Sequence, residues 1–242
     1  MNTKKQEIII NDIIINIVFK KIKNIHLSVY PPDGMVRVSA PFRISVDTIR
    51  VFVISRLGWI RRQRRKFEEQ ERQPAREYIS RESHYFLGNR HLLNVIENGG
   101  RQCAVLRNKE YIDLYIRKGA SILQKQAVMT EWYREQLKQI VPELIEKCQK
   151  ITGVTANDWQ VKRMKTRWGT CNIKAKRIWL NLELAKKNIN CIEYIIVHEL
   201  VHLLERRHND KFKAYMDKFM PNWKQYKEEL NKSPLRDENW SY

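Results

Sequence analysis

The spacing of apolar residues divides the chain into a strand-rich first half and a helix-rich second half. Ile and Val dominate short runs near residues 8–10, 13–19, 26–30 and 35–39, a pattern typical of strands. The turn sequence Pro31-Pro32-Asp33-Gly34 predicts that the last two runs form a hairpin. A strand followed by a turn is predicted over residues 85–90, and four more short strands near 105–106, 111–117, 159–164 and 178–182.

Helical spacing is found once in the first half and repeatedly in the second. Apolar residues from Val46 to Ile60 recur every three or four positions, which predicts one helix over about residues 45–70. A long helix is expected over about 121–150, where Pro142 should kink or divide it. Further helices are predicted over 189–205, 209–218 and 223–230.

These elements predict an α+β fold. We expect a basic, β-rich N-terminal region over residues 1–120, containing the one helix at about 45–70. Residues 121–232 should form the helix-rich region that carries the candidate chemistry, and residues 233–242 a C-terminal tail. The polar segment 68–76 reads as a linker.

The chain is strongly basic, with 46 Lys and Arg against 27 Asp and Glu and a net charge of +19. This charge favours a polyanionic partner such as nucleic acid or a nucleotide, although a solvated basic surface explains it equally well. The cationic run Arg61–Lys66 has the same two interpretations. No apolar run reaches the ~18 residues needed to span a bilayer, and the four cysteines are too widely spaced for a disulfide framework. A cytoplasmic protein is expected, and its oligomeric state is left open.

The clearest chemical signal is the sequence His198-Glu199-Leu200-Val201-His202. Residues four apart lie on the same face of a helix, so both imidazoles can bind one ion, most simply one Zn²⁺ per chain. Glu199 can then act as general base on a water whose pKa the ion lowers. The surrounding helix is strongly apolar, so its polar side chains need partners if they are buried. An ordinary hydrogen-bonded histidine pair is the simpler alternative.

A third ligand must come from outside this pair. His208 is favoured because Asn209-Asp210 predicts a new helix start, so the chain should turn between Glu205 and His208. Glu205, three residues after His202, is the rival ligand, but it can instead pair with the neighbouring arginines. Three protein ligands leave a fourth position open, as in catalytic zinc sites.

Several motifs together resemble one known family. The segment Thr166–Cys171 (TRWGTC), the strand sequence Ile178–Asn181 (IWLN), and the histidine motif with His208-Asn209 are similar to the YgjP-like (SprT-related) metallopeptidase family. Val36–Pro41 and Gly58–Ile60 also look like that family's opening region, so the resemblance covers almost the whole chain. Two departures are Thr170 in place of serine and Arg206-Arg207 before His208.

The resemblance implies a zincin-like metallopeptidase core with a small antiparallel sheet beside the active-site helix. It also implies that His198, His202 and His208 are the metal ligands and that Glu199 is the catalytic carboxylate. Within its motifs, four residues are candidates for contacting substrate or an oxyanion: Arg167, Trp168, Gly169 and Asn181. Arg167 could instead pair with an acidic side chain, and Trp168 could belong to the core. The strand at 178–182 is the candidate for pairing with an extended peptide.

Three functions are compatible with the sequence. The first is a zinc-dependent peptidase acting on a peptide or protein substrate. The second is a metal-dependent phosphohydrolase that cleaves a nucleotide at the same site, which the net charge and the cations Lys162, Arg163 and Lys165 favour, although a histidine triad suits zinc better than magnesium. The third is a peptidase docked on nucleic acid by its basic N-terminal half, for which no base-reading motif is present.

Overall fold

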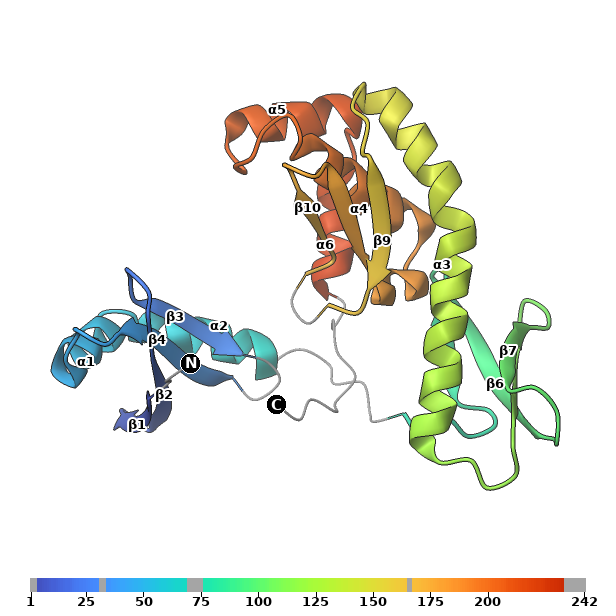
Figure 1. The fold of residues 1–242 in the computed structure, drawn as a ribbon, viewed down its shortest axis with the longest axis horizontal. Helices are drawn as coiled ribbons and strands as arrows, with labels where there is room; N and C mark the ends of the chain where they lie inside the picture. The colour runs from blue at the N-terminus through green and yellow to red at the C-terminus, as the bar shows by residue number, and fades with distance from the viewer. Residues whose placement is uncertain (1–3, 31–33, 69–75, 165–166, 233–242) are drawn as a thin grey trace. The chain divides into compact units, whose positions relative to one another are not determined.

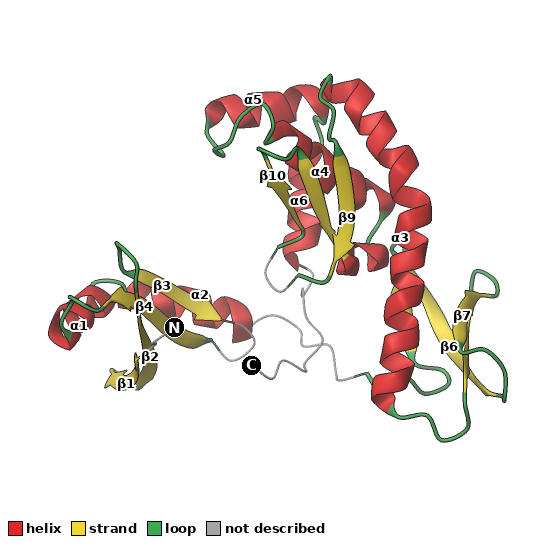
Figure 2. Cartoon of the chain, viewed as in Figure 1, coloured by secondary structure: helices red, strands yellow, loops and turns green. Residues whose placement is uncertain are grey.

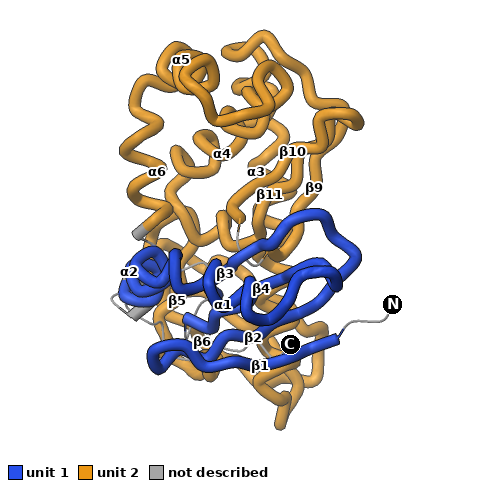
Figure 3. The backbone as a smooth tube through the Cα atoms, turned by 90° about the vertical axis from the view of Figure 1, so that its left-hand side faces the viewer, with its two compact units in different colours: residues 1–73, 240–242 blue, residues 74–239 orange. Residues whose placement is uncertain are grey.

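A computed structural model describes residues 4–30, 34–68, 76–164 and 167–232. The chain forms two compact units, which are coloured separately in Figure 3. Of the described residues, 4–68 belong to the first unit and 76–232 to the second. Helices and strands occur together in both units (Figure 2), so the expected α+β fold is confirmed. No helix in the described ranges has the length and apolar character required to cross a bilayer.

The first unit is a four-stranded sheet with two helices. Its strands are β1 (Lys4–Ile10), β2 (Ile13–Lys20), β3 (His26–Tyr30) and β4 (Met35–Pro41), in the order β1-β2-β4-β3. β3 and β4 are antiparallel with Tyr30 opposite Met35, as the predicted hairpin requires. The turn residues 31–33 lie outside the described residues.

The single helix predicted over about 45–70 is two helices, α1 (Val46–Ile54) and α2 (Leu57–Glu68). Ser55 ends α1, where its hydroxyl donates to the carbonyl of Phe52 at 2.7 Å. The apolar spacing continues across this break because Ile49 and Ile60 enter the same core. The spacing of apolar residues reports which positions are buried, so it cannot show that the helix is interrupted between Ile54 and Leu57.

The second unit begins with a four-stranded sheet. Its strands are β5 (Ser83–Phe86), β6 (Asn89–Glu97), β7 (Cys103–Leu106) and β8 (Tyr111–Ile116), in the order β5-β6-β8-β7. The long helix α3 (Ile122–Thr152) packs against β7 and β8 and also against helix α4 (Ile189–Val201). Figure 1 shows α3 between β6 and β7 on one side and the C-terminal helices on the other. One core therefore joins this sheet to the helices, with Phe86 of β5 against Trp132 of α3. The boundary expected near residue 120 falls inside this unit.

Pro142 does not divide α3, contrary to one of the expected outcomes. Pro142 lies on the exposed side of the helix. The carbonyl group that loses its helical hydrogen bond to proline is that of Lys138, which is also exposed and can be solvated. Solvation of this carbonyl lowers the cost of the proline, which inside a helix is otherwise about 3 kcal/mol or more.

A three-stranded sheet packs beside α4. Its strands are β9 (Asp158–Lys162), β10 (Gly169–Asn172) and β11 (Arg177–Asn181), followed by a short 3-10 helix, η1 (Leu182–Lys186). The order is β10-β11-β9; β11 is antiparallel to β10 but parallel to β9, so the sheet is mixed and not antiparallel throughout. β11 is the central strand. The strand at 178–182, which was predicted to pair with a peptide, corresponds to β11. Both edges of β11 are already paired, one with β10 and one with β9, so in the described residues the edge strand beside α4 is β10.

Candidate metal centre

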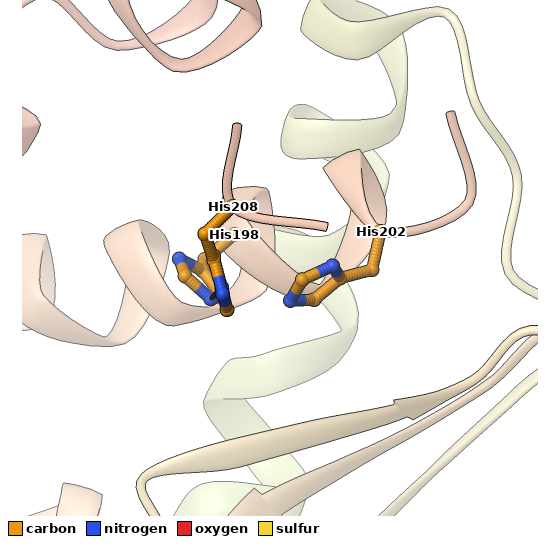
Figure 4. A group of neighbouring side chains, drawn as sticks. All are labelled: His198, His202 and His208. Atoms are coloured by element: carbon orange, nitrogen blue, oxygen red, sulfur yellow. Dashed lines mark hydrogen bonds between the residues drawn. The ribbon is translucent and has the colours of Figure 1, made fainter. Parts of the chain in front are cut away.

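Three histidines meet at the C-terminal end of α4. His198 lies in the last turn of the helix, His202 is its C-cap residue, and His208 precedes α5 (Asp210–Phe219). Figure 4 shows the His202 ring directed toward the other two. The nearest ring nitrogens of the three residues all lie within 4.8 Å of one another, close enough for one ion to contact them all. The helix predicted to reach Glu205 ends at Val201, and this early end allows the chain to turn back.

The turn after α4 brings His208 to the group and leaves Glu205 outside it. Glu205 accepts a hydrogen bond from the backbone N–H of Arg207 at 3.1 Å, so its carboxylate stabilises the turn. Asn209 then caps α5 by accepting from the N–H of Phe212 at 3.0 Å. Phe212 is 2% exposed, and its ring lies 4.7–4.9 Å from all three imidazole rings. The rings are therefore held by packing as well as by the chain.

The hydrogen bonds of the histidines leave ring nitrogens that can bind a metal ion. The Nδ1 of His202 lies 3.3 Å from the carbonyl oxygen of Glu205. If Nδ1 carries the proton and donates to this oxygen, Nε2 is an unprotonated acceptor or ligand. The Nε2 atoms of His198 and His208 are 3.0 Å apart, while Nδ1 of His198 is buried without a hydrogen-bond partner among the described residues. Three imidazoles thus converge with no carboxylate among them.

The environment favours neutral imidazoles. Burial, together with the charges of His202, His208 and Lys227, lowers the pKa of His198 to about 3. Burial is also the main cause that lowers the pKa of His202 and of His208. Neutral imidazole is the form that binds metal ions. The three neutral imidazoles can therefore bind a metal cation without first losing a proton.

Glu199 lies beside the triad under a strand. It is 5% exposed, and burial raises the pKa of its carboxyl group to about 8, against the opposing effect of Arg167. Gly169, the first residue of β10, lies directly over it. A Cβ atom on Gly169 would stand 2.7 Å from Oε1 of Glu199 and 2.7 Å from Cγ2 of Ile195. The missing side chain of Gly169 therefore makes room for the carboxylate.

Replacing Gly169 by alanine is expected to lower kcat/KM by about 10²-fold, because the methyl group displaces the Glu199 carboxylate or moves β10 away from α4. Hydrolysis rates and circular dichroism of the purified variant would measure activity and folding separately. Gly99→Ala is the matched control, since a Cβ there meets nothing within 4 Å. A folded Gly169→Ala protein with wild-type kcat/KM would contradict this explanation of the glycine.

A cavity of about 570 Å³ opens beside the triad and is called here the metal-site pocket. Three parts of the chain line this pocket. The first is the segment 167–171 with Ile173, and the second is α4 with the turn after it, which supplies Tyr194, Ile195, the three histidines, Glu199 and Arg206. The third is α6 (Trp223–Lys232), which supplies Lys227, Leu230 and Asn231. Its size suits a ligand of several residues or a small cofactor. Of the four substrate-contact candidates, Arg167, Trp168 and Gly169 line this pocket.

Asn181, the fourth candidate, does not line the pocket. It is fully buried, and its Nδ2 donates to the carbonyls of Met164 at 2.9 Å and Arg167 at 2.7 Å. Its backbone N–H donates to the carbonyl of Trp168 at 2.8 Å. With its amide engaged in this way, Asn181 holds the segment that carries Arg167 and Trp168. Trp168 itself is half-buried, with Lys187 stacked 5.6 Å from its ring.

The residues of the site that were not predicted from the sequence include Tyr194, Phe212, Arg206 and Lys227. Tyr194 could have been found, because it lies four residues before His198 on the same helix face and packs edge-on against that ring. Lys227 comes from α6 (Trp223–Lys232), which carries no local signal of its place beside the histidines.

Comparisons with known proteins bear on this site. A family model described as YgjP-like, metallopeptidase domain, matches residues 23–233. Among solved structures, the metallopeptidase zymogen abylysin of Pyrococcus abyssi is 22% identical, with a TM-score of 0.35 over 37% of this chain and 90% of that chain. The metallopeptidase zymogen jannalysin of Methanocaldococcus jannaschii is 18% identical, with a TM-score of 0.34 over 37% and 92%. No curated protein matches the chain.

Proposed function

The chain belongs to the YgjP-like metallopeptidase family, and we propose on this premise that it hydrolyses peptide bonds with one zinc ion held by His198, His202 and His208. Membership makes it a metal-dependent hydrolase. The observation that carries the proposal is the convergence of three ring nitrogens within 4.8 Å, beside a buried carboxylate and an open pocket. We further propose that the second unit has a zincin-like core.

The residues present fit a zinc ion. Three neutral imidazoles are a common zinc donor set, and they leave a position open for substrate or water. The hydrogen bond that Nδ1 of His202 can donate to the Glu205 carbonyl is the kind of outer contact that orients a ligating imidazole. The two Nε2 atoms 3.0 Å apart in His198 and His208 would otherwise share one proton at most.

Bound zinc would supply Lewis-acid chemistry at the open side of the triad. Glu199 is proposed as the group that accepts a proton from the attacking water and then delivers it to the leaving amine. Its burial under Gly169 fixes the carboxylate, and a cation on the neighbouring imidazoles would lower its raised pKa again. In the described residues β10 is paired on its β11 side only, so its other edge is the proposed place for an extended peptide.

Zinc-dependent cleavage of an unstructured protein such as casein tests this proposal. The purified chain is expected to cleave it, to lose this activity to below a tenth on removal of metal by a chelator, and to recover it with about one equivalent of zinc. Mass spectrometry of the products identifies new peptide termini. A metal-loaded, folded protein that cleaves no casein or peptide pool would overturn the peptidase assignment.

A phosphohydrolase at the same site is the second candidate, favoured by the cations Arg167, Arg206 and Lys227 in the metal-site pocket. Such a protein would release phosphate or pyrophosphate from nucleoside triphosphates. Release that depends on the metal and on Glu199, without any peptide cleavage, would select this function in place of the first.

Docking on nucleic acid is a compatible third proposal. The described part of the first unit holds fourteen Lys and Arg residues against four Asp and Glu residues, with Arg61 and Arg62 exposed on α2. We expect binding of a single-stranded oligonucleotide that weakens steeply with salt, and Arg61→Glu/Arg62→Glu should reduce the salt slope by about one for each phosphate that the protein no longer neutralises. Lys118→Glu/Lys138→Glu, with the same charge change in the second unit, is the control. Binding that is insensitive to salt would refute this proposal.

A further inference from the structure

The walls of the metal-site pocket carry an unbalanced positive charge. Arg167, Arg206 and Lys227 all line it, and all three are exposed. Among the described lining residues the single carboxylate is Glu199, which is buried beneath Gly169. Exposed cations with no acid opposite them attract an anionic ligand into a concave site, where low-dielectric walls strengthen the field.

Lys227 is directed into this pocket by the packing of α6. The ring of Trp223, at the start of α6, stacks on Tyr194 of α4 with centroids 6.4 Å apart, and its Nε1 donates to Asp217 at 2.7 Å. Lys227 lies four residues after Trp223, on the same face, with Nζ 5.5 Å from that ring. It is near enough to His198 and His208 for its charge to act on both. Its ammonium therefore lies beside the triad.

Arg167 occupies a different side of the reacting centre. Its backbone carbonyl is fixed by Asn181, and its charge acts on the Glu199 carboxylate. Arg206 lies in the turn after α4, where the adjacent acid, Glu205, is engaged with the backbone of Arg207. The three cations thus come from separate segments of the chain and line the same pocket as the triad and Glu199.

We propose that the metal-site pocket selects peptides with acidic side chains close to the scissile bond, and that Arg167, Arg206 and Lys227 are the specificity-determining residues. This inference rests on the proposed peptidase function. It names carboxylate side chains as the recognised groups, since guanidinium groups bind carboxylates in a bidentate manner and the ammonium group adds a flexible point charge. A phosphate-bearing ligand would meet the same cations and is an outcome of the test.

The test separates binding from cleavage. Three fluorescent peptides of one sequence are compared, in which four central positions hold Glu, Gln or Lys; Glu and Gln have the same size, so their difference reports charge. Binding is measured by anisotropy with the Glu199→Gln protein, so that no turnover is needed. We expect the Glu peptide to bind about ten times more tightly than the Gln peptide and the Lys peptide least, with a preference that falls as salt rises.

Charge reversal assigns the preference to residues. In the Glu199→Gln background, Lys227→Glu and Arg206→Glu should each lower the ratio of Glu-peptide to Gln-peptide affinity by at least threefold, while the Lys118→Glu control should leave it unchanged. Equal affinity for the Glu and Gln peptides would overturn the inference even if casein is cleaved. If a nucleoside triphosphate competes for the pocket and the Glu peptide does not bind, the inference is also overturned. If the wild-type protein cleaves no peptide but the Glu199→Gln protein still binds the Glu peptide more tightly than the Gln peptide, the peptidase function is overturned and the selection of anionic ligands by the pocket is retained.

Discussion

Replacing His202 by alanine is expected to remove stable zinc binding and with it nearly all hydrolytic activity. Structural zinc sites bind their ion with roughly 10–16 kcal/mol, which shared among three ligands is about 3–5 kcal/mol each, so the loss of one ligand weakens affinity by about 10²- to 10⁴-fold. The remaining imidazoles of His198 and His208 cannot restore the geometry, because each comes from its own fixed segment. Metal analysis after gel filtration, together with kcat/KM, measures both effects.

His26→Ala is the matched control for this experiment. His26 begins β3 in the first unit and is exposed, and it lies outside the group of converging histidines. We expect about one zinc per chain in this variant and in the wild type, and much less in His202→Ala. One equivalent of zinc in His202→Ala would contradict the ligand assignment. Circular dichroism shows whether a loss of metal reflects the missing imidazole or a loss of folding.

Glu199→Gln is expected to keep the metal and lower kcat by about 10² to 10⁴-fold, the usual contribution of a general base. Glutamine has the size of glutamate, so it still fits beneath Gly169, but its amide does not accept a proton at neutral pH. The measured quantities are kcat and KM separately and the zinc content. KM should change little, since the side chain is proposed to act on water and not to hold substrate.

Glu193→Gln serves as the control on the same helix. Glu193 pairs with Lys147 at 2.6 Å, and its side chain takes no part in the metal-site pocket. Loss of an ion pair between partly exposed groups costs little, so activity should stay near wild type. A Glu199→Gln protein that holds zinc and retains more than a tenth of wild-type kcat would exclude the general-base role.

The part of the site that could be predicted is the part encoded locally. The four-residue spacing of His198 and His202, and Asn209 as a capping residue, both concern neighbours on one stretch of chain, and the structure places these residues as the spacing predicts. The resemblance to the YgjP-like family is confirmed over residues 23–233. The ligand roles themselves stay predictions until metal is measured.

What could not be predicted depends on contacts between distant segments. Asn181 belongs to a motif shared with the substrate-facing residues, but its side chain donates hydrogen bonds to the carbonyls of Met164 and Arg167, which precede it by 17 and 14 residues in the chain. Similarly, Lys227 lines the pocket with the histidines because α6 packs on α4, where Trp223 stacks on Tyr194. In the first sheet of the second unit, a strand and a turn were expected over 85–90, where β5 and the turn after it lie, but β6 (Asn89–Glu97) was not expected. Its pairing with β8 in parallel is a contact between distant segments.

All three histidines lie between residues 198 and 208, which affects how zinc can act on folding. Ligands so close in sequence need only a short loop to meet, and the entropy of closing a loop grows slowly but steadily with its length. An unfolded chain would therefore keep part of its affinity for zinc. Because a ligand stabilises a fold only by its preference for the native state, the rise in melting temperature with zinc should be smaller than the affinity of the native site alone would give. For this protein, thermal shift would underestimate how tightly the metal is held, and direct titration is the proper measure.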